Sequence, residues 1–346
     1  MKASLLKDTV KSFYAIGRSV CISGPPGGGK TSIAKQSARE LKKPSITVHM
    51  PTSLVEDFGV PDIVSQQIAA ENEQADVVDT SFGYRLPAWF PVEGGPLDKG
   101  RGGFLIFDDR NQADPSIQKV LANIIQERTL HGYRMAEGWW PMSTGNRQSD
   151  RAGANRILSH LADRETELEF ESNLVDSTRW MTDNEGATEV IAFLQFRPGL
   201  LHDFDPQRDK NPTPRSWHEG VSPVIGNVPP EAEYDCFKGA IGEGAAAEFT
   251  GFLRIWRDLD DPDMIIANPK QARVPTDSAT QYALCGAMAA RATEANFGNI
   301  IVFAKRFPPD FEVLMISLCV RNNPDVCESS AYINWLSQSD THSLLF

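Results

Sequence analysis

The chain has 346 residues, and its 41% hydrophobic and 23% charged residues are typical of a globular protein of about two domains. Its formal net charge of −12 argues against a broad nucleic-acid-binding surface, because that function needs clustered lysine and arginine. An acidic, solubilising surface explains the charge more simply, and a local basic channel inside an assembly stays open as the alternative.

Cysteines, histidines and hydrophobic runs set further limits. The five cysteines are scattered without a C-x-x-C pair, which argues against a zinc site and a disulfide framework. The six histidines show no metal-ligand spacing, and no Ser/His/Asp or Cys/His pattern indicates nucleophilic catalysis. Residues 1–8 place charge too early for a signal peptide, and no run of about 18 apolar residues suggests a membrane span. We therefore expect a reduced, cytoplasmic protein with no membrane partner.

The N-terminal elements surround a glycine-rich motif. Residues 1–17 have the spacing of an amphipathic helix ending near Gly17, and residues 18–23 form a short β-branched strand. Residues 24–31 then read Gly-Pro-Pro-Gly-Gly-Gly-Lys-Thr, a complete G-x-x-x-x-G-K-[ST] phosphate-binding loop. Helical spacing over 32–41 places this loop at a helix N-terminus, where backbone N–H groups and the helix dipole favour anions.

Each residue type in the loop has a chemical reason. Glycines lack a Cβ, so their N–H groups can approach phosphate oxygens closely. Lys30 supplies a cation for the β- and γ-phosphates, and the Thr31 hydroxyl is a ligand for Mg²⁺. The residues predicted to bind the nucleotide are Gly24, Pro25, Pro26, Gly27, Gly28, Gly29, Lys30, Thr31 and Ser32.

The segment after this helix begins as a strand and then becomes irregular. Residues 44–49 are predicted as a second strand, and residues 50–59 as a loop with a short helical turn. Residues 62–100 are polar at first and then aromatic. This stretch is too long for a plain connection, so it indicates an insertion with its own structure.

A buried strand over residues 102–109 ends in two carboxylates. Asp108 emerges at the carboxyl edge of the predicted sheet, where ligands bind in open α/β folds. With Thr31 it would hold Mg²⁺, while Asp109 would orient or deprotonate the attacking water. The alternative is a strand capped by two solvated acids.

Later elements repeat the alternation of strand and helix. A helix is predicted over 115–127, a hairpin over 131–134 and a strand over 140–146, which indicates an α/β fold with a parallel sheet between helices. Beyond about residue 172 the strand pattern ends, and an α-helical region follows. Its helices are predicted over 186–200, 231–257, 278–305 and 311–320.

Together these motifs resemble those of an AAA+ ATPase of the MoxR group, and most closely a subgroup common in bacterial viruses and prophages. The resemblance rests on Walker A at 24–31, Walker B at 104–109, and the stretches 111–118, 126–128 and 143–146. It implies a P-loop AAA+ domain with a parallel five-stranded sheet over residues 1–172, including an insertion at about 62–100. An α-helical lid with a helical C-terminal extension would follow over 173–346.

The resemblance also implies roles for individual residues. Asn146 corresponds to the sensor-1 residue that helps to place the lytic water. Arg164 takes the place of the arginine finger that reaches a neighbouring subunit's ATP, with Arg156 as the second candidate. Arg215, within Thr213-Pro-Arg-Ser-Trp217, is similar to the sensor-2 arginine that contacts the γ-phosphate. Taken singly, each arginine can instead be an ordinary surface cation.

Two positions depart from the family pattern. Walker B ends in Asp108-Asp109 where Asp-Glu is usual, which withdraws the second carboxylate by about one methylene and is expected to slow hydrolysis. Glu165 follows Arg164 where an aromatic residue is usual, so the packing that aims this arginine is expected to differ.

The insertion corresponds to a helix-and-hairpin element that faces the ring pore in this family. Within it, Phe82, Tyr84 and Trp89 either grip a client protein or belong to the core, and the sequence leaves both readings open.

The sequence is interpreted as an ATPase that binds ATP and Mg²⁺ and works as a homo-hexamer on a partner protein, in the cytoplasm of a bacterium or a phage-infected host. By the resemblance, the partner is often a protein with a von Willebrand A-type or metallopeptidase-like domain. Two alternatives stay open. A nucleic-acid motor or loader is disfavoured by the acidic charge, and a slowly hydrolysing switch or scaffold is suggested by Asp109.

Overall fold

The computed structural model describes residues 1–68, 77–147, 150 and 159–338. The chain divides into two compact units, Met1–Glu171 and Ser172–Phe346. Among the described residues, no helix combines the length and the apolar character needed to cross a membrane.

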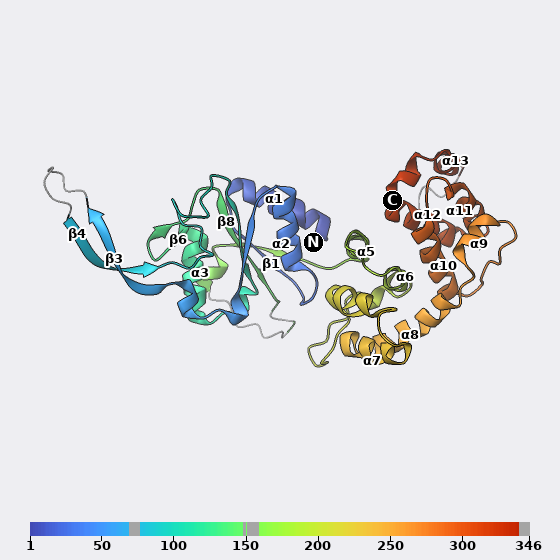
Figure 1. The fold of residues 1–346 in the computed structure, drawn as a ribbon, viewed down its shortest axis with the longest axis horizontal. Helices are drawn as coiled ribbons and strands as arrows, with labels where there is room; N and C mark the ends of the chain where they lie inside the picture. The colour runs from blue at the N-terminus through green and yellow to red at the C-terminus, as the bar shows by residue number, and fades with distance from the viewer. Residues whose placement is uncertain (69–76, 148–149, 151–158, 339–346) are drawn as a thin grey trace. The chain divides into compact units, whose positions relative to one another are not determined.

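The N-terminal unit is built on a parallel sheet of five strands in the order β2-β5-β8-β1-β9 (Figure 1). Its strands are β1 (Val20–Ser23), β2 (Ser45–His49), β5 (Gly103–Asp108), β8 (Trp139–Gly145) and β9 (Thr166–Glu169). Every pairing in this sheet is parallel. The predicted P-loop α/β fold is therefore confirmed, although the sequence pattern did not locate the short strand β9.

Helices cover both faces of this sheet. The helices α1 (Ala3–Ile16) and α2 (Lys30–Glu40) pack with Phe104 and Ile106 of β5. On the other face, α3 (Pro115–Glu127) and α4 (Ser159–Ala162) pack with Leu105 and Phe107 of the same strand. Successive side chains of a strand point to opposite faces, so an uninterrupted apolar run is what a strand buried on both faces requires.

The predicted insertion forms a hairpin. Strands β3 (Val60–Ile68) and β4 (Val77–Arg85) pair antiparallel, with Val60 opposite Arg85, and extend away from the parallel sheet (Figure 1). The described residues of 62–100 contain this hairpin and turns but no helix, whereas the resemblance implied both a helix and a hairpin. Two short 3₁₀ helices, η1 (Met50–Thr52) and η2 (Val55–Phe58), precede the hairpin, and a small second hairpin joins β6 (Thr129–Leu130) to β7 (Tyr133–Arg134).

The aromatic residues of the insertion have different environments. Trp89 makes edge contacts with Phe58 and Phe107, and its indole N–H donates to the carbonyl of Asp57 at 3.2 Å. Trp89 is therefore a core residue. Tyr84 is 38% exposed and stacks on the His131 ring, with centroids 3.8 Å apart. The side chain of Phe82 lies outside the described part of the structure.

The described residues of the C-terminal unit form helices joined by loops and turns, with no strand. Its helices are α5 (Leu174–Asp183), α6 (Thr188–Phe196), η5 (Pro198–Leu200), η6 (Ser216–Val221), η7 (Ser222–Val224), α7 (Pro230–Ile241), α8 (Glu243–Arg257), α9 (Pro262–Ala267), α10 (Ser278–Arg291), α11 (Phe297–Ala304), α12 (Pro309–Asn322), η8 (Pro324–Glu328) and α13 (Ser330–Gln338). One core surrounds the rings of Phe193, Trp217 and Phe249, and a second lies among α9 to α13.

Two helices that were predicted as continuous are each broken in two. Gly242, with φ of +83°, separates α7 from α8, because a left-handed residue ends a helix. Between α10 and α11, the Asn296 side chain accepts a bond from the Thr293 N–H and donates to the Arg291 carbonyl. These bonds satisfy backbone groups where the chain turns, so the single predicted helix over 278–305 was wrong.

Candidate nucleotide-binding site

The glycine-rich loop leaves β1 and leads directly into α2, which begins at Lys30. Gly27 and Gly29 have φ of +72° and +103°, a region that side chains disfavour. A Cβ at Gly24 would lie 2.6 Å from the Phe170 carbonyl oxygen, at the end of β9. Gly24 is therefore needed for the fit of the loop against the sheet, in addition to the backbone access that the sequence predicted.

The Lys30 ammonium is 6% exposed and is held by three oxygen atoms. Its Nζ donates to the carbonyls of Gly24 at 2.9 Å and Pro25 at 3.0 Å, and to Oδ1 of Asn146 at 2.9 Å. The loop cation and the predicted sensor amide are thus in direct contact, although 116 positions separate them in the chain.

Asn146 is fixed by a second asparagine. The Asn111 carboxamide donates to the Asn146 carbonyl at 2.6 Å and accepts from the Asn146 N–H at 3.2 Å. Asn111 is 3% exposed and lies in η3 (Arg110–Gln112), immediately after Walker B. Asn111 begins the stretch 111–118, on which the resemblance partly rests, but no role was predicted for it. The only sequence signal for such a role was its position just after the predicted strand over 102–109.

The Asp108 carboxylate lies among side chains from three elements. Its Oδ1 accepts hydrogen bonds from the hydroxyls of Thr31 and, at 2.7 Å, Thr144. Its Oδ2 lies 3.2 Å from Nδ1 of His49, at the end of β2. The two predicted Mg²⁺ ligands, Thr31 and Asp108, are therefore brought together, whereas Thr144 and His49 were not predicted.

The oxygen atoms of Thr31 and Asp108 fit Mg²⁺ as ligands. Mg²⁺ is usually bound by one or two carboxylate groups together with phosphate oxygens and water. Within the described residues there is no group of three or more His, Cys, Asp or Glu side chains placed to hold a metal. The Thr31 hydroxyl and the Asp108 carboxylate, in contact beside the phosphate loop, match a Mg²⁺ site that is completed by phosphate oxygens and water.

Asp109 follows the strand in a left-handed conformation, with φ of +54°. Its N–H donates to the Thr144 hydroxyl at 3.0 Å. Aspartate and asparagine tolerate this conformation better than most residues, because their short polar side chains can bond locally. The departure from Asp-Glu thus coincides with a backbone geometry that favours the shorter acid.

A buried ion pair lies behind the site. Arg110 and Glu165 contact each other with side chains that are 6% and 1% exposed. The Ser143 hydroxyl donates to Oε1 of Glu165 at 2.7 Å. The unusual acid after Arg164 is therefore an anchor that connects β9 to the end of Walker B.

Arg164, the first candidate for the arginine finger, lies apart from this cluster. Arg164 is partly buried just before β9, and Thr166 pairs with Val20 at the beginning of β1. Arg164 is thus at the amino edge of the sheet, where the parallel strands begin, while the phosphate loop is at the carboxyl edge, where they end. Arg156 lies outside the described residues.

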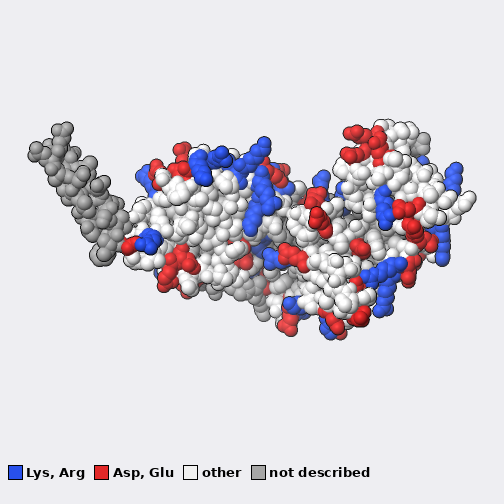
Figure 2. All heavy atoms as spheres, in the orientation of Figure 1, with Lys and Arg blue, Asp and Glu red and all other residues white. Residues whose placement is uncertain are grey.

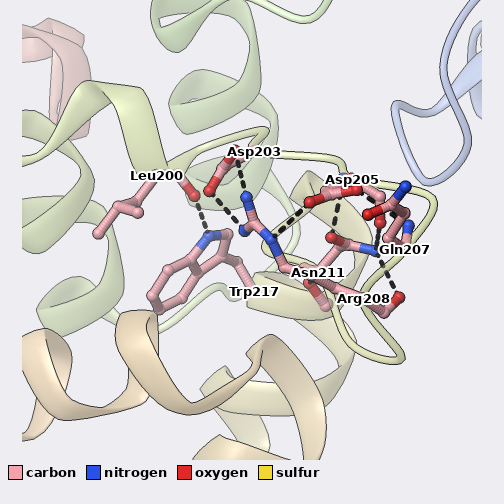
Figure 3. Close-up of polar contacts among 8 residues, drawn as sticks. Leu200, Asp203, Asp205, Gln207, Arg208, Asn211 and Trp217 are labelled. Atoms are coloured by element: carbon pink, nitrogen blue, oxygen red, sulfur yellow. Dashed lines mark hydrogen bonds and ion pairs between the residues drawn. The ribbon is translucent and has the colours of Figure 1, made fainter. Parts of the chain in front are cut away.

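Arg215 belongs to the C-terminal unit, where it is exposed at the beginning of a helical segment. The preceding loop is held by its own side chains (Figure 3). Arg208 pairs with Asp203 at 2.8 Å and with Asp205 at 3.2 Å, and the Trp217 indole N–H donates to the Leu200 carbonyl at 2.7 Å. These contacts give the segment that carries Arg215 a defined conformation within its unit.

Residues 19–176 match the family model of the AAA domain, dynein-related subfamily. This segment is similar to an AAA domain, and the match covers a little under half of the chain. It includes all five strands of the parallel sheet, together with Lys30, Asp108 and Asn146. No curated protein matches the chain.

Solved structures of NtrX from Brucella abortus are similar to the chain at low identity. One is 14% identical, covers 91% of this chain and 67% of that one, and gives a TM-score of 0.40. Those in complex with ADP and ATP are 12% and 13% identical, cover 99% of this chain and 68% of theirs, and give TM-scores of 0.33 and 0.35.

The ion pair behind the site gives a stability prediction. Replacing Glu165 with Ala leaves the Arg110 charge buried without its acid, so the free energy of unfolding should fall by about 3–5 kcal/mol in a denaturant titration. The matched control is Glu169→Ala, which removes an exposed pair with Arg147 and should change stability by about 1 kcal/mol or less. Equal effects of the two substitutions would contradict a structural role for the buried pair.

Proposed function

We propose that the protein is a Mg²⁺-dependent AAA+ ATPase of the MoxR type, which hydrolyses ATP in a homo-hexameric ring to remodel or activate a partner protein. The observation that carries the proposal is the convergence of Lys30, Thr31, Asp108 and Asn146 at one edge of the sheet. These side chains supply a cation, two oxygen ligands and an amide where the phosphate loop meets α2.

The chain's residues divide the chemistry among them. The loop N–H groups and Lys30 would bind the β- and γ-phosphates, since bonds between a charged donor and phosphate are stronger than those to carbonyl oxygens. Thr31 and Asp108 would hold Mg²⁺, which neutralises negative charge on the phosphate oxygens. Asp109 would accept a proton from the attacking water, and Asn146 would orient that water.

The position of Arg164 supports an assembly. This residue is at the amino edge of the sheet, so it faces away from the phosphate loop of its own subunit. An arginine there can stabilise charge on a phosphoryl group only when another copy presents a nucleotide to it. The ring, a lid role for Arg215, a client or von Willebrand A-type partner and a cytoplasmic location are parts of the same proposal.

A slowly hydrolysing switch is the second candidate. The short carboxylate of Asp109 and its left-handed backbone favour this function, because both affect where the proton acceptor lies relative to the water. A nucleic-acid motor is not favoured. On the face in Figure 2, acidic and basic side chains are intermingled in both units, and the net charge is −12.

The phosphate-loop lysine provides the first test. Lys30→Ala should weaken ATP binding by about 100-fold or more in isothermal titration calorimetry, because charge-assisted bonds to phosphate are lost. The control is Lys119→Ala on the exposed face of α3, which should bind ATP as the unchanged protein does. Wild-type affinity in Lys30→Ala would mean that ATP does not use this loop.

The second acid tests hydrolysis separately from binding. Asp109→Asn should keep ATP bound while hydrolysis falls on the order of 10²-fold or more, because the amide cannot accept the proton. Asparagine tolerates the same backbone conformation, so the fold should be retained, and Asp209→Asn in an exposed loop is the control. If Asp109→Asn does not change the rate of ATP hydrolysis, Asp109 has no part in the mechanism, and the switch is favoured.

Mixed assemblies test the arginine. Arg164→Ala should bind ATP normally but hydrolyse it on the order of 10³-fold more slowly, if it acts as a finger. Mixing this variant with Lys30→Ala should restore part of the activity, because a mixed ring can join an intact loop to an intact Arg164 on the next subunit. No recovery, together with a monomeric mass in ATP by light scattering, would exclude the ring.

A further inference from the structure

A pocket of about 460 Å³ lies at the amino edge of the sheet, away from the phosphate loop. Three segments line it: the turn between α1 and β1, the end of α3, and the segment before β9. The lining residues are Gly17, Arg18, Ser19, Ile125, Gln126, Arg128, Asp163 and Arg164.

The pocket is basic although the protein is acidic. Its charged side chains are three arginines and one aspartate, which gives a formal charge of +3 − 1 = +2 in a chain whose net charge is −12. Positive groups gathered in a hollow attract anions more effectively than the same groups spread over a surface.

Arg128 is partly buried, and no acidic side chain of the described residues pairs with it. One guanidinium nitrogen, Nη2, donates to the Gly17 carbonyl at 2.8 Å. The other, Nη1, is buried and has no hydrogen-bond partner among the described residues. Burial lowers the pKa of this arginine to about 10. A cation held in this way is stabilised when an anion binds beside it.

Ser19 provides an independent observation of the same kind. Its hydroxyl is buried and likewise lacks a hydrogen-bond partner in the described part of the chain. A buried donor without an acceptor is unfavourable, because it has lost its hydrogen bond to water and gained none in return. Both donors belong to residues that line one basic pocket, so an oxyanion bound there would lie beside polar groups that lack partners among the described residues.

The other two arginines leave donors for the same ligand. Arg18 makes only long contacts, from Nη2 to the Asp163 carbonyl at 3.3 Å and from Nε to the Thr166 hydroxyl at 3.5 Å. Among the described residues, the Arg164 side chain has no hydrogen bond or ion pair. A guanidinium group offers five donors in a planar fork that matches the oxygens of phosphate.

We propose that this pocket binds a phosphate-type oxyanion through Arg18, Arg128, Arg164 and the Ser19 hydroxyl. Two sources have this chemistry: a phosphate compound free in solution, and the triphosphate of a nucleotide bound to a neighbouring copy of the chain. The second source rests on the proposed ring ATPase, whereas the first does not. An arginine finger would account for Arg164 alone and leaves the buried donors of Arg128 and Ser19 unexplained.

The site is tested with inorganic tripolyphosphate and the full chain carrying Lys30→Ala, so that the phosphate loop does not compete. Calorimetric titration at low salt should show saturable binding, and adding Arg128→Gln should weaken it by about tenfold or more. Adding Arg134→Gln, at an exposed arginine outside the pocket, should leave the affinity unchanged. Absence of saturable binding, or equal affinities with Arg128→Gln and Arg134→Gln, would overturn the proposal.

The folding of the variants is checked by their thermal unfolding midpoints. Arg128→Gln removes a buried cation but also its hydrogen bond to the Gly17 carbonyl, so the two effects oppose each other and the midpoint should change little. If this variant does not fold, Arg18→Gln replaces it, because Arg18 is exposed and its loss should weaken tripolyphosphate binding in the same way.

The two sources are distinguished with the otherwise unchanged chain saturated with a non-hydrolysable ATP analogue. If a neighbour's triphosphate fills the pocket, the assembled protein should no longer bind tripolyphosphate. If the natural anion is free in solution, tripolyphosphate should bind with the affinity found for Lys30→Ala. Failure of the unchanged chain to bind the analogue would count against the proposed ATPase, while the Lys30→Ala titration would still decide whether the pocket binds anions.

Discussion

The carboxylate of Asp108 connects three elements at the carboxyl edge of the sheet. One oxygen accepts the hydroxyls of Thr31, in α2, and Thr144, in β8, while Asp108 itself ends β5. Moving the start of α2 away from β5 would therefore break the bond between Thr31 and Asp108. Lys30 adds a second connection through Asn146, which Asn111 holds by its backbone. The site is thus fixed by side chains that also connect the secondary structure, so its geometry and the local fold depend on each other.

The elements that could be predicted are those encoded by neighbouring residues. The phosphate loop was identified from its residue motif, β5 from its uninterrupted apolar run and α3 from its helical period. The contact of Thr31 with Asp108 followed from the rule that parallel strands end at the same edge. To predict these parts of the site, it was enough to know the order of strands and helices along the chain, without knowing which strands pair in the sheet.

The parts that could not be predicted depend on distant residues or on single backbone angles. Thr144, His49 and Asn111 reach the site only because β2, β5 and β8 are neighbours, and strand order is not written in local spacing. Strand β9 has four residues, as β1 does, but its sequence Thr-Glu-Leu-Glu has one apolar residue and so lacks the apolar run that identified β1. The break at Gly242 depends on one positive φ, since the apolar pattern continues through it.

The buried Arg110–Glu165 pair connects the carboxyl and amino edges of the sheet. Arg110 follows Asp109 in the chain, at the carboxyl edge of the sheet. Glu165 follows Arg164, at the amino edge, so the pair connects the two edges. The pair is almost wholly shielded from water, where its electrostatic attraction is screened least. A backbone shift at Asp109 would therefore act on the segment that carries Arg164 through this contact. The two side chains thus connect Asp109, beside the subunit's own phosphate loop, with Arg164, which in the proposed ring would reach the nucleotide of the neighbouring subunit.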